Sequence, residues 1–417
     1  MTTEGKRAVV IGGGVVGAAS AYFLVRDGWQ VTIVDQGEFG RACSHGNCGY
    51  VCPSHVLPLA VPGAIRDSLK ALLSPNSPFT IRPRFSPSLW SWLLSFARRC
   101  NKKDMLTSGT AIQALLRSSR TLYPEILERE HMDCEWENRG LMFVFQTQAA
   151  MDHYEATDRL LREQFQMPAR RLDSATLAGM EPALKPGLAG AWHYEGDSHL
   201  RADRLMAAWK VVLERLGVVV RTRCKFNNFD SSSGTARVAN TDAGEIAGDL
   251  FVLATGAWTP LLNKDLGCKI PIQPGKGYSI TMPRPAICPT YPLILEEHRV
   301  AITPFRSGYR IGSTMEFAGY DSTLNRSRLD LLRDSAKLYL HEPTCEPVQE
   351  EWFGWRPMTP DSVPIIDWSP ALGNVMVAAG HNMLGLSMAP ATGKLIAEMA
   401  GRRTPHVDPA PYSVRRF

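Results

Sequence analysis

Hydrophobic and polar positions in the first forty residues follow a pattern that predicts one β–α–β unit. Residues 7–11 form a short apolar run rich in β-branched side chains, which is typical of a buried strand. A glycine-rich turn follows, and residues 18–26 contain helix-forming residues without proline before Gly28 ends the helix. Residues 31–34 form a second buried strand. A unit of this order and length implies a parallel sheet.

Later apolar runs predict that distant parts of the chain return to the same sheet. Residues 218–222 and 250–254 are typical of further strands of the parallel sheet, and residues 374–379 form another buried strand before a glycine turn. Residues 53–87 are rich in proline and are predicted to be irregular. Helices are expected at about residues 89–97, 111–130, 201–216 and 386–399. A separate, largely antiparallel sheet is expected from the alternating segments 279–282, 299–303 and 309–312.

Composition narrows the class of protein. Of the 417 residues 44% are hydrophobic and 21% charged, which is ordinary for a soluble globular chain of about two domains. The net charge of +5 comes from scattered basic residues, which argues against nucleic acid as the main partner. We find neither an apolar run long enough to span a membrane nor a secretory signal, so a cytoplasmic location is expected. The nine cysteines are therefore expected to be reduced, mostly buried thiols.

The turn after the first strand carries the pattern G-x-G-x-x-G, which is typical of dinucleotide binding. Gly12 permits the tight turn, Gly14 lets the backbone approach a pyrophosphate, and Gly17 lets the helix pack close to the strand. Asp35 ends the second strand, where it can accept hydrogen bonds from the adenosine ribose and repel a 2′-phosphate, which disfavours NADP. The residues expected to contact the dinucleotide here are Gly12, Gly14, Val15, Val16, Gly17, Asp35 and Gln36. The alternative is a tight turn in an unrelated α/β protein.

Two later turns favour FAD over NAD. Residues 252–258, V-L-A-T-G-A-W, form a strand that ends in a small-residue turn, which brings backbone close to a ligand at the carboxyl edge of a sheet. Residues 379–393 contain a second strand–glycine–helix turn, whose helix N-terminus suits a partner with negative charge, such as a reduced flavin. An NAD-dependent dehydrogenase leaves this turn without a role. The expected cofactor contacts are Ala254, Thr255, Gly256, Trp258, Gly380, His381, Met383, Leu384 and Gly385.

Taken together, these motifs make the chain resemble the flavin-dependent D-amino-acid dehydrogenases, within the wider group of D-amino-acid oxidase, glycine oxidase and sarcosine oxidase. The resemblance covers nearly the whole chain. It includes A-T-G-A-W, K-G-Y-S at residues 276–279, R-P-M-T-P-D at residues 356–361, and G-H-x-x-x-G at residues 380–385 followed by A-P-A-T-G. The K-G-Y-S and R-P-M-T-P-D forms look more like the dehydrogenase branch than the oxidases.

The resemblance implies the fold class α/β: a Rossmann-like parallel-sheet domain that binds FAD, and a discontinuous second α+β domain, built on an antiparallel sheet, that binds substrate. We assign residues 1–75, 196–268 and 351–417 to the FAD-binding domain. Residues 76–195 and 269–350 are assigned to the substrate-binding domain.

The loop after the second strand matches the one that crosses the flavin in this group. Its expected cofactor contacts are Ser44, His45, Gly46, Asn47, Cys48 and Gly49. Some relatives tether the flavin covalently through a histidine near this loop, and His45 stands one position from that site. Cys43, Cys48 and Cys52 crowd the same loop. Because a metal or cluster would need a fourth ligand at suitable spacing, we interpret them as thiols beside the cofactor and predict no metal.

The implied reaction is oxidation of an amino acid, whose α-hydrogen leaves as hydride to flavin N5 and whose imino product water hydrolyses to an oxo acid. Arg356 matches the position that pairs with the substrate carboxylate, and the alternative is a structural salt bridge. Tyr278 is a candidate for the active-site wall or a hydroxyl contact, with core packing as the alternative. His381 is expected to bind the flavin or to pack locally. Glycine oxidase carries an arginine within its G-H-x-x-x-G run where this chain has Asn382, Met383 and Leu384, which weakens the analogy with the oxidases.

The predicted activity is therefore FAD-dependent oxidative deamination of a D-amino acid, or of a cyclic one such as proline or hydroxyproline. Electrons would pass to a quinone or an electron-transfer protein. The alternatives are an oxygen-using oxidase of glycine, sarcosine or another secondary amine, and a non-catalytic flavin-binding subunit. Residues 57–100, rich in proline, tryptophan and leucine and followed by basic residues, suggest either a helix covering the cleft or a peripheral contact with the inner face of the cell membrane.

Overall fold

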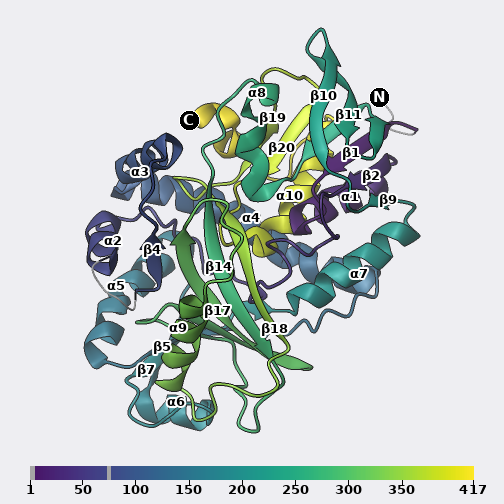
Figure 1. The fold of residues 1–417 in the computed structure, drawn as a ribbon. Coiled ribbons are helices and arrows are strands. Elements are labelled where there is room, and N and C mark those ends of the chain that lie inside the picture. The colour runs from purple at the N-terminus through teal and green to yellow at the C-terminus, as the bar shows by residue number, and fades with distance from the viewer. Residues whose placement is uncertain (1–4, 73–76) are drawn as a thin grey trace.

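Two sheets organise the described residues of the computed structural model, 5–72 and 77–417 (Figure 1). The smaller has six strands in the order β19-β20-β13-β1-β2-β9. Its strands are β1 Arg7–Ile11, β2 Gln30–Val34, β9 Val219–Arg221, β13 Leu250–Leu253, β19 Ile365–Trp368 and β20 Val375–Ala379. All neighbours pair in parallel except β19, which runs antiparallel to β20 at the edge. Each segment that the apolar runs assign to this sheet pairs in it.

Helices cover this sheet on the side where α1, Val15–Arg26, follows the glycine turn. Helix α10, Gly385–Ala400, packs closely on α1, because a Cβ at Gly393 would lie only 2.5 Å from the backbone of Ala19. The two helices lie beside the parallel sheet in Figure 1, although they come from opposite ends of the chain. Helix α4, Lys102–Arg129, packs in turn against α10, and α7, Ala202–Arg215, against α1.

The larger sheet has nine strands and lies below the first in Figure 1. In spatial order they are β18 Glu350–Met358, β14 Gln273–Met282, β17 Gly308–Phe317, β16 Val300–Phe305, β15 Leu293–Leu295, β5 Leu141–Phe145, β7 Gly190–Tyr194 and β6 Arg170–Asp173, with β4 Phe79–Ile81 beside β17. One face packs against α9, Arg326–Lys337, and α6, Ser174–Met180, in an apolar core. The opposite face is left free to form a cavity.

The α/β fold class with a parallel and a largely antiparallel sheet is confirmed, and so are the four predicted helices. The prediction that residues 53–87 are irregular is wrong in part, because α2, Ala64–Leu72, and β4 lie within them. Helix α2 was missed because it is short and prolines stand on both sides of it, so its helical spacing of apolar residues is not apparent in the sequence. Strand β18 lies in the nine-stranded sheet, so the chain crosses to the six-stranded sheet between β18 and β19 rather than at residue 351.

Several elements have no counterpart in the sequence patterns. They include α5 Gln148–Phe165, the three-stranded sheet of β10 Phe226–Ser232, β11 Thr235–Thr241 and β12 Gly244–Ala247, the pair β3 Tyr50–Val51 and β8 Ser198–His199, α8 Asn263–Leu266, and the 3₁₀ helices Gly256–Leu262, Ala410–Tyr412 and Val414–Arg416. The predicted helix at residues 89–97 is α3, Pro87–Arg99, which extends two residues further at each end. None of the helices in the described ranges has both the length and the apolar character needed to cross a bilayer. All nine cysteines are free thiols.

Candidate active site

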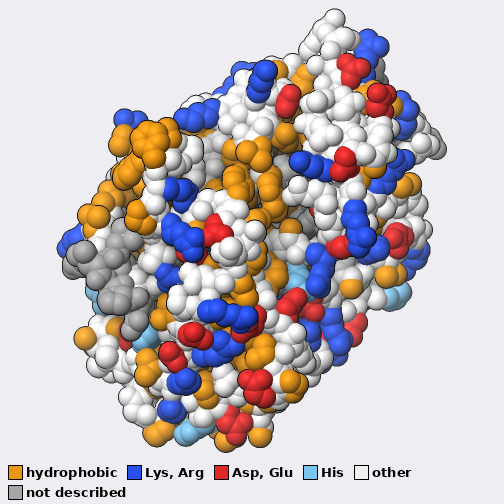
Figure 2. All heavy atoms as spheres, in the orientation of Figure 1, with side chains coloured by type: hydrophobic (Ala, Val, Ile, Leu, Met, Phe, Trp, Pro, Cys, Tyr) orange, Lys and Arg blue, Asp and Glu red, His pale blue; other side chains and the backbone are white. Residues whose placement is uncertain are grey.

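A cavity of about 2250 Å³ lies between the two sheets. It is lined by the carboxyl ends of the parallel strands on one side and by the free face of the nine-stranded sheet on the other. Small-molecule pockets typically measure about 300–1,000 Å³, so this one has room for a dinucleotide together with a substrate. Figure 2 shows apolar side chains around the hollow near the centre of this face of the molecule.

The first glycine turn enters this cavity in a shape that requires glycine. Gly12 has a φ of +111°, and a Cβ there would lie 2.4 Å from the carbonyl oxygen of Ala254. A Cβ at Gly17 would lie 1.9 Å from the oxygen of Gly12. Helix α1 therefore starts in direct contact with β1, and its N-cap residue, Gly14, provides no side-chain hydrogen bond. The positive end of α1 is thus directed at the cavity, where it suits a pyrophosphate.

Asp35 lies in the cavity wall next to Gln36, at the carboxyl end of β2. Its Oδ2 accepts a hydrogen bond from Gly13 N at 2.7 Å, and its Oδ1 accepts one from Gly37 N at 2.8 Å. The carboxylate thereby joins the glycine turn to the turn after β2. Because each carboxylate oxygen has two lone pairs, Asp35 keeps acceptor capacity for a ribose hydroxyl, and this role stays a prediction.

A second helix N-terminus meets the same cavity at α10. Met383, Leu384 and Gly385 line the wall, and the N-cap residue Leu384 makes no side-chain hydrogen bond. His381 also lines the cavity, and its Nε2 lies 2.9 Å from Thr392 Oγ1. Burial lowers the pKa of His381 to about 3, so the ring is neutral at physiological pH. Gly380, with a φ of +79°, shapes the turn behind it.

The loop at residues 44–49 crosses the cavity, although only part of it lines the wall. Ser44, Gly46, Asn47 and Cys48 do so, and Ser44 Oγ accepts a hydrogen bond from Val15 N at 3.0 Å. A Cβ at Gly46 would lie 2.2 Å from the ring of Trp352, so glycine is required here. The remaining two residues of the loop point elsewhere. His45 contacts Glu350 at 2.8 Å, and Gly49 packs on the carbonyl of Leu200.

The turn after β13 completes the cofactor-facing wall. Ala254, Thr255, Gly256 and Trp258 all line the cavity. The indole of Trp258 packs edge-on against that of Trp355, whose ring centroid is 5.4 Å away. Two helix N-termini whose own N-cap residues make no side-chain hydrogen bond, glycines that admit no Cβ and a cavity of this volume fit a flavin dinucleotide.

Arg356 extends from β18 across the neighbouring strand β14. A Cβ at Gly277 of that strand would lie 2.3 Å from the guanidinium carbon, so the glycine makes room for the arginine. Arg356 Nη1 donates a hydrogen bond to the carbonyl oxygen of Thr314 at 2.6 Å. Ser313 and Thr314 have φ values of 114° and 54°, a strained bulge in β17 that turns carbonyls toward the guanidinium. Backbone carbonyl oxygens thus position Arg356, and its positive charge is not neutralised by an ion pair with a described residue.

No carboxylate of the described residues lies within ion-pair distance of Arg356, so the structural salt bridge is absent from this part of the chain. The titratable groups that act on the pKa of Arg356 are the thiols of Cys43 and Cys48. Burial raises the pKa of Cys43 to about 11 and also raises that of Cys48, so both are neutral. The guanidinium remains cationic because arginine does not deprotonate in proteins. The positive charge of Arg356 in the cavity wall therefore has no counter-ion among residues 5–72 and 77–417.

Tyr278 borders the cavity, but its side chain is buried in the apolar core between the nine-stranded sheet and α9. Its hydroxyl donates a hydrogen bond to Glu316 Oε2 at 2.5 Å. Burial and this carboxylate raise the pKa of Tyr278. The hydroxyl already has a partner on the far side of the sheet, which favours the core interpretation.

Five other residues that line the cavity were not predicted from the sequence. Trp352 and Trp355 lie on β18 close to Arg356, and His55, Tyr154 and Glu296 line the part of the cavity near β5 and β15. The only sequence signal that points to the tryptophans is their nearness to the R-P-M-T-P-D motif. The last three come from segments that no motif singles out.

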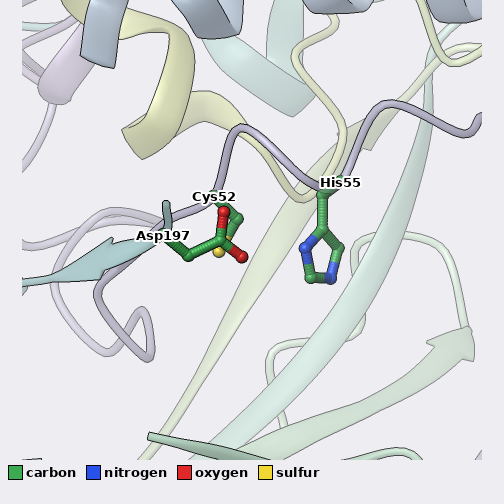
Figure 3. Close-up of side chains that lie close together, drawn as sticks. All are labelled: Cys52, His55 and Asp197. Carbon is green, nitrogen blue, oxygen red and sulfur yellow. The ribbon is translucent and has the colours of Figure 1, made fainter. Parts of the chain in front are cut away.

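Cys52, His55 and Asp197 lie close together beside this part of the cavity (Figure 3). Their potential ligand atoms are within 4.8 Å of one another. The carboxylate of Asp197 already accepts hydrogen bonds from Ser54 N at 3.1 Å and Ser54 Oγ at 2.5 Å. Burial raises the pKa of the Cys52 thiol well above its usual value, whereas a metal would bind the thiolate. We interpret the cluster as a buried polar network that fixes the loop before His55.

Comparison with known proteins agrees with this geometry. The family model described as "FAD dependent oxidoreductase" (DAO) matches residues 7–399. A D-amino acid dehydrogenase of Granulibacter bethesdensis is 30% identical over 421 residues, covering 99% of both chains. One of Xanthobacter autotrophicus is 31% identical over 422 residues, again covering 99% of both. Among solved structures, glycine oxidase from Geobacillus kaustophilus has a TM-score of 0.79 at 23% identity, and the alignment covers 99% of each chain. L-proline dehydrogenase from P. horikoshii has a TM-score of 0.73 at 20% identity, and the alignment covers 99% of this chain and 98% of that one.

Proposed function

The chain belongs to the DAO family of FAD-dependent oxidoreductases, and from this premise we propose that it is a dehydrogenase that oxidatively deaminates D-amino acids. The observation that carries the proposal is Arg356, a cation in the cavity wall without a counter-ion in the described residues. An α-carboxylate supplies the missing charge, and the planar guanidinium can bind it through two parallel hydrogen bonds. The curated relatives named D-amino acid dehydrogenase support the choice of substrate.

In this proposal the bound FAD supplies the acceptor for the hydride that leaves the α-carbon. Arg356 holds the substrate carboxylate and so fixes the direction of the α-carbon. The positive N-termini of α1 and α10, which both face the cavity, would stabilise negative charge on a bound dinucleotide. The substrate loses the hydride from its α-carbon and a proton from its nitrogen, and water then hydrolyses the imino acid to an oxo acid and ammonia. Neutral His381 contributes no charge to this step.

The test is an anaerobic screen in which purified holoenzyme is mixed with single amino acids and the visible absorbance of the flavin is followed. D-amino acids, including D-proline and D-hydroxyproline, are expected to bleach the flavin, and their L-enantiomers to leave it oxidised. In air, an artificial dye should be reduced without release of hydrogen peroxide. Peroxide release from glycine or sarcosine would instead identify an oxidase. A flavin that no amine bleaches would identify a non-catalytic flavin-binding subunit.

We further propose that α2 and α3 bind an anionic membrane surface, where electrons pass to a quinone. The apolar side chains of this patch are more than two-fifths exposed: Ile65, Leu69, Phe85, Trp90 and Leu94. Figure 2 shows apolar side chains gathered at the upper left, where α3 lies in Figure 1. The opposite side of α3 packs into the protein through Leu89 and Trp92, and Arg98 and Arg99 in its last turn are complementary to anionic lipid.

Co-sedimentation with vesicles that contain anionic lipid tests this second part. The double variant Trp90→Ser, Leu94→Ser should bind several-fold less protein than the wild type. Val211→Ser, which changes an exposed apolar residue on α7, should bind normally. Equal binding of all three proteins would refute the membrane contact without affecting the proposal for the reaction.

A further inference from the structure

The cavity continues past Arg356 along the free face of the nine-stranded sheet. Between Arg356 and β5 the wall is formed by small and apolar side chains, including Ala301 on β16, Ile294 on β15 and Phe143 on β5. At the end of this path lies Glu296, directly after β15. A substrate held by its carboxylate at Arg356 therefore has room for a long, extended side chain.

The strand register places Glu296 level with Thr314, whose carbonyl oxygen binds the guanidinium of Arg356. Arg356 binds the carbonyl of Thr314 on β17. Ser313, its neighbour, pairs with Val300 on β16, and Val300 pairs with Leu295 on β15. Glu296 follows Leu295 as Thr314 follows Ser313, so the two residues lie at the same height of the sheet, two strands apart. Adjacent strands are about 4.8 Å apart, which separates the two sites by roughly 10 Å.

Glu296 has one carboxylate oxygen that lacks a partner. Its Oε1 pairs with Arg299 Nη1 at 2.7 Å, whereas its Oε2 is buried and accepts no hydrogen bond from any described residue. The neighbouring Glu297 is already occupied, because it accepts hydrogen bonds from the backbone of Gln146 and from the Tyr339 hydroxyl. A buried carboxylate oxygen without a hydrogen-bond donor destabilises the folded protein. A ligand that supplies a donor here removes that penalty and so binds more favourably.

The surroundings of Glu296 favour a cation over an anion. Glu296, Glu297 and Arg299 all line this part of the cavity, so carboxylates outnumber cations there. The Glu296 side chain is 11% exposed and the Arg299 side chain 65%, so solvent screens the charge of Arg299 more strongly than that of Glu296. Burial raises the pKa of Glu296 to about 7, and an arriving cation would restore its ionised form. Nearby His55 has a buried, unpartnered Nδ1 and a pKa lowered to about 4, so it adds no positive charge that would repel the ligand.

We propose that Glu296 determines substrate specificity by binding the cationic end of a basic side chain, so that the preferred substrates are D-lysine and D-arginine. This inference rests on the proposed function, because it takes the α-carboxylate to be held by Arg356. The extended side chain of either amino acid, with a hydrogen bond at each end, bridges the two sites. The apolar wall between them accommodates the methylene groups.

The experiment compares D-lysine and D-arginine with D-norleucine, which has a similar apolar chain but no cationic end. Anaerobic flavin bleaching gives kcat/KM for each substrate. The wild type should prefer the basic substrates to D-norleucine. Glu296→Gln should lower kcat/KM for D-lysine and D-arginine by about 10- to 100-fold, because the cationic end of the substrate loses its negatively charged partner, while D-norleucine changes by less than about three-fold.

Two controls keep the result interpretable. Glu296→Leu should favour D-norleucine over the basic substrates, and its flavin absorbance shows that the protein is folded and holds FAD. Arg299→Gln removes the partner charge and should not abolish the preference for basic substrates. If D-norleucine and D-lysine react equally well and Glu296→Gln changes neither, the specificity assignment is wrong. That outcome leaves D-amino-acid oxidation intact, whereas a flavin that no D-amino acid bleaches would refute the proposed function itself.

Discussion

Substituting Arg356 by methionine removes the guanidinium but keeps an unbranched side chain of similar length above Gly277. The hydrogen bond to the Thr314 carbonyl is lost as well, and that carbonyl borders the cavity, where water can replace the donor. Because Arg356 has no ion pair within the described chain, its removal leaves no buried carboxylate unpaired. We therefore expect the variant to fold and to bind FAD.

The fall in kcat/KM depends on the hydrogen bonds between the Arg356 guanidinium and the substrate carboxylate. A hydrogen bond to a charged group contributes about 1.5–3 kcal/mol. Part of this is offset because the free guanidinium is hydrated in the cavity before substrate binds, so a bidentate pair should contribute about 2–4 kcal/mol to transition-state binding. At about 1.4 kcal/mol for each factor of ten, kcat/KM should fall by about 30- to 700-fold. Arg356→Lys keeps the positive charge but not the planar guanidinium, so its kcat/KM should lie between that of Arg356→Met and that of the wild type.

Stopped-flow bleaching of the flavin under anaerobic conditions measures this loss directly. Arg159→Met, which changes an arginine on the solvent side of α5, is the matched control and should behave as wild type. A single D-amino acid at several concentrations separates binding from the reductive step. The carboxylate assignment is refuted if Arg356→Met binds FAD and is bleached by every reactive amino acid with the wild-type kcat/KM.

Three further outcomes follow from the site. Gly12→Ala places a Cβ against the Ala254 carbonyl at a φ of +111°, so the purified protein should have a low ratio of flavin to protein absorbance, whereas Gly179→Ala, with nothing within 4 Å, should keep the normal ratio. Asp35→Ala loses the acceptor for Gly13 and Gly37 and should weaken FAD binding at least ten-fold, measured by fluorescence titration of the apoprotein; unchanged affinity would contradict the ribose assignment. Because burial lowers the folded-state pKa of His381 to about 3, the unfolded state binds one more proton than the folded state below pH 6.5. Wild-type stability should therefore fall relative to His381→Asn as the pH drops from 6.5 toward 4, by up to about 1.4 kcal/mol per pH unit in denaturant titrations, and parallel pH profiles would contradict a buried, neutral histidine.

Local patterns in the sequence determine the cofactor half of this protein. The glycine spacing of the turn from Gly12 to Gly17 is visible within six residues of the chain, although Gly12 also packs against the distant Ala254. The small-residue turn at Gly256 and the glycine turn before α10 are equally short in the sequence. Such short turns leave a regular signature in the chain, which is why the β–α–β unit and the entry of both helices into the cavity were predicted. Arg356 was also identified from its motif, by resemblance.

Only the tertiary structure decides which side chains face the cavity from the nine-stranded sheet. Successive residues of a strand point to opposite faces, so a shift of one residue in the pairing of β14 with β17 would exchange the two faces. The bulge at Ser313 and Thr314 sets that register, and with it Tyr278 is directed into the core while Arg356 lies in the cavity wall. Glu296 and His55 reach the same cavity from segments about 240 residues apart in the sequence. The sequence motifs predict the glycine turns that face the cavity, because glycine spacing is visible along the chain. Which side chains of the nine-stranded sheet face the same cavity depends on pairings between distant strands, which no local pattern encodes.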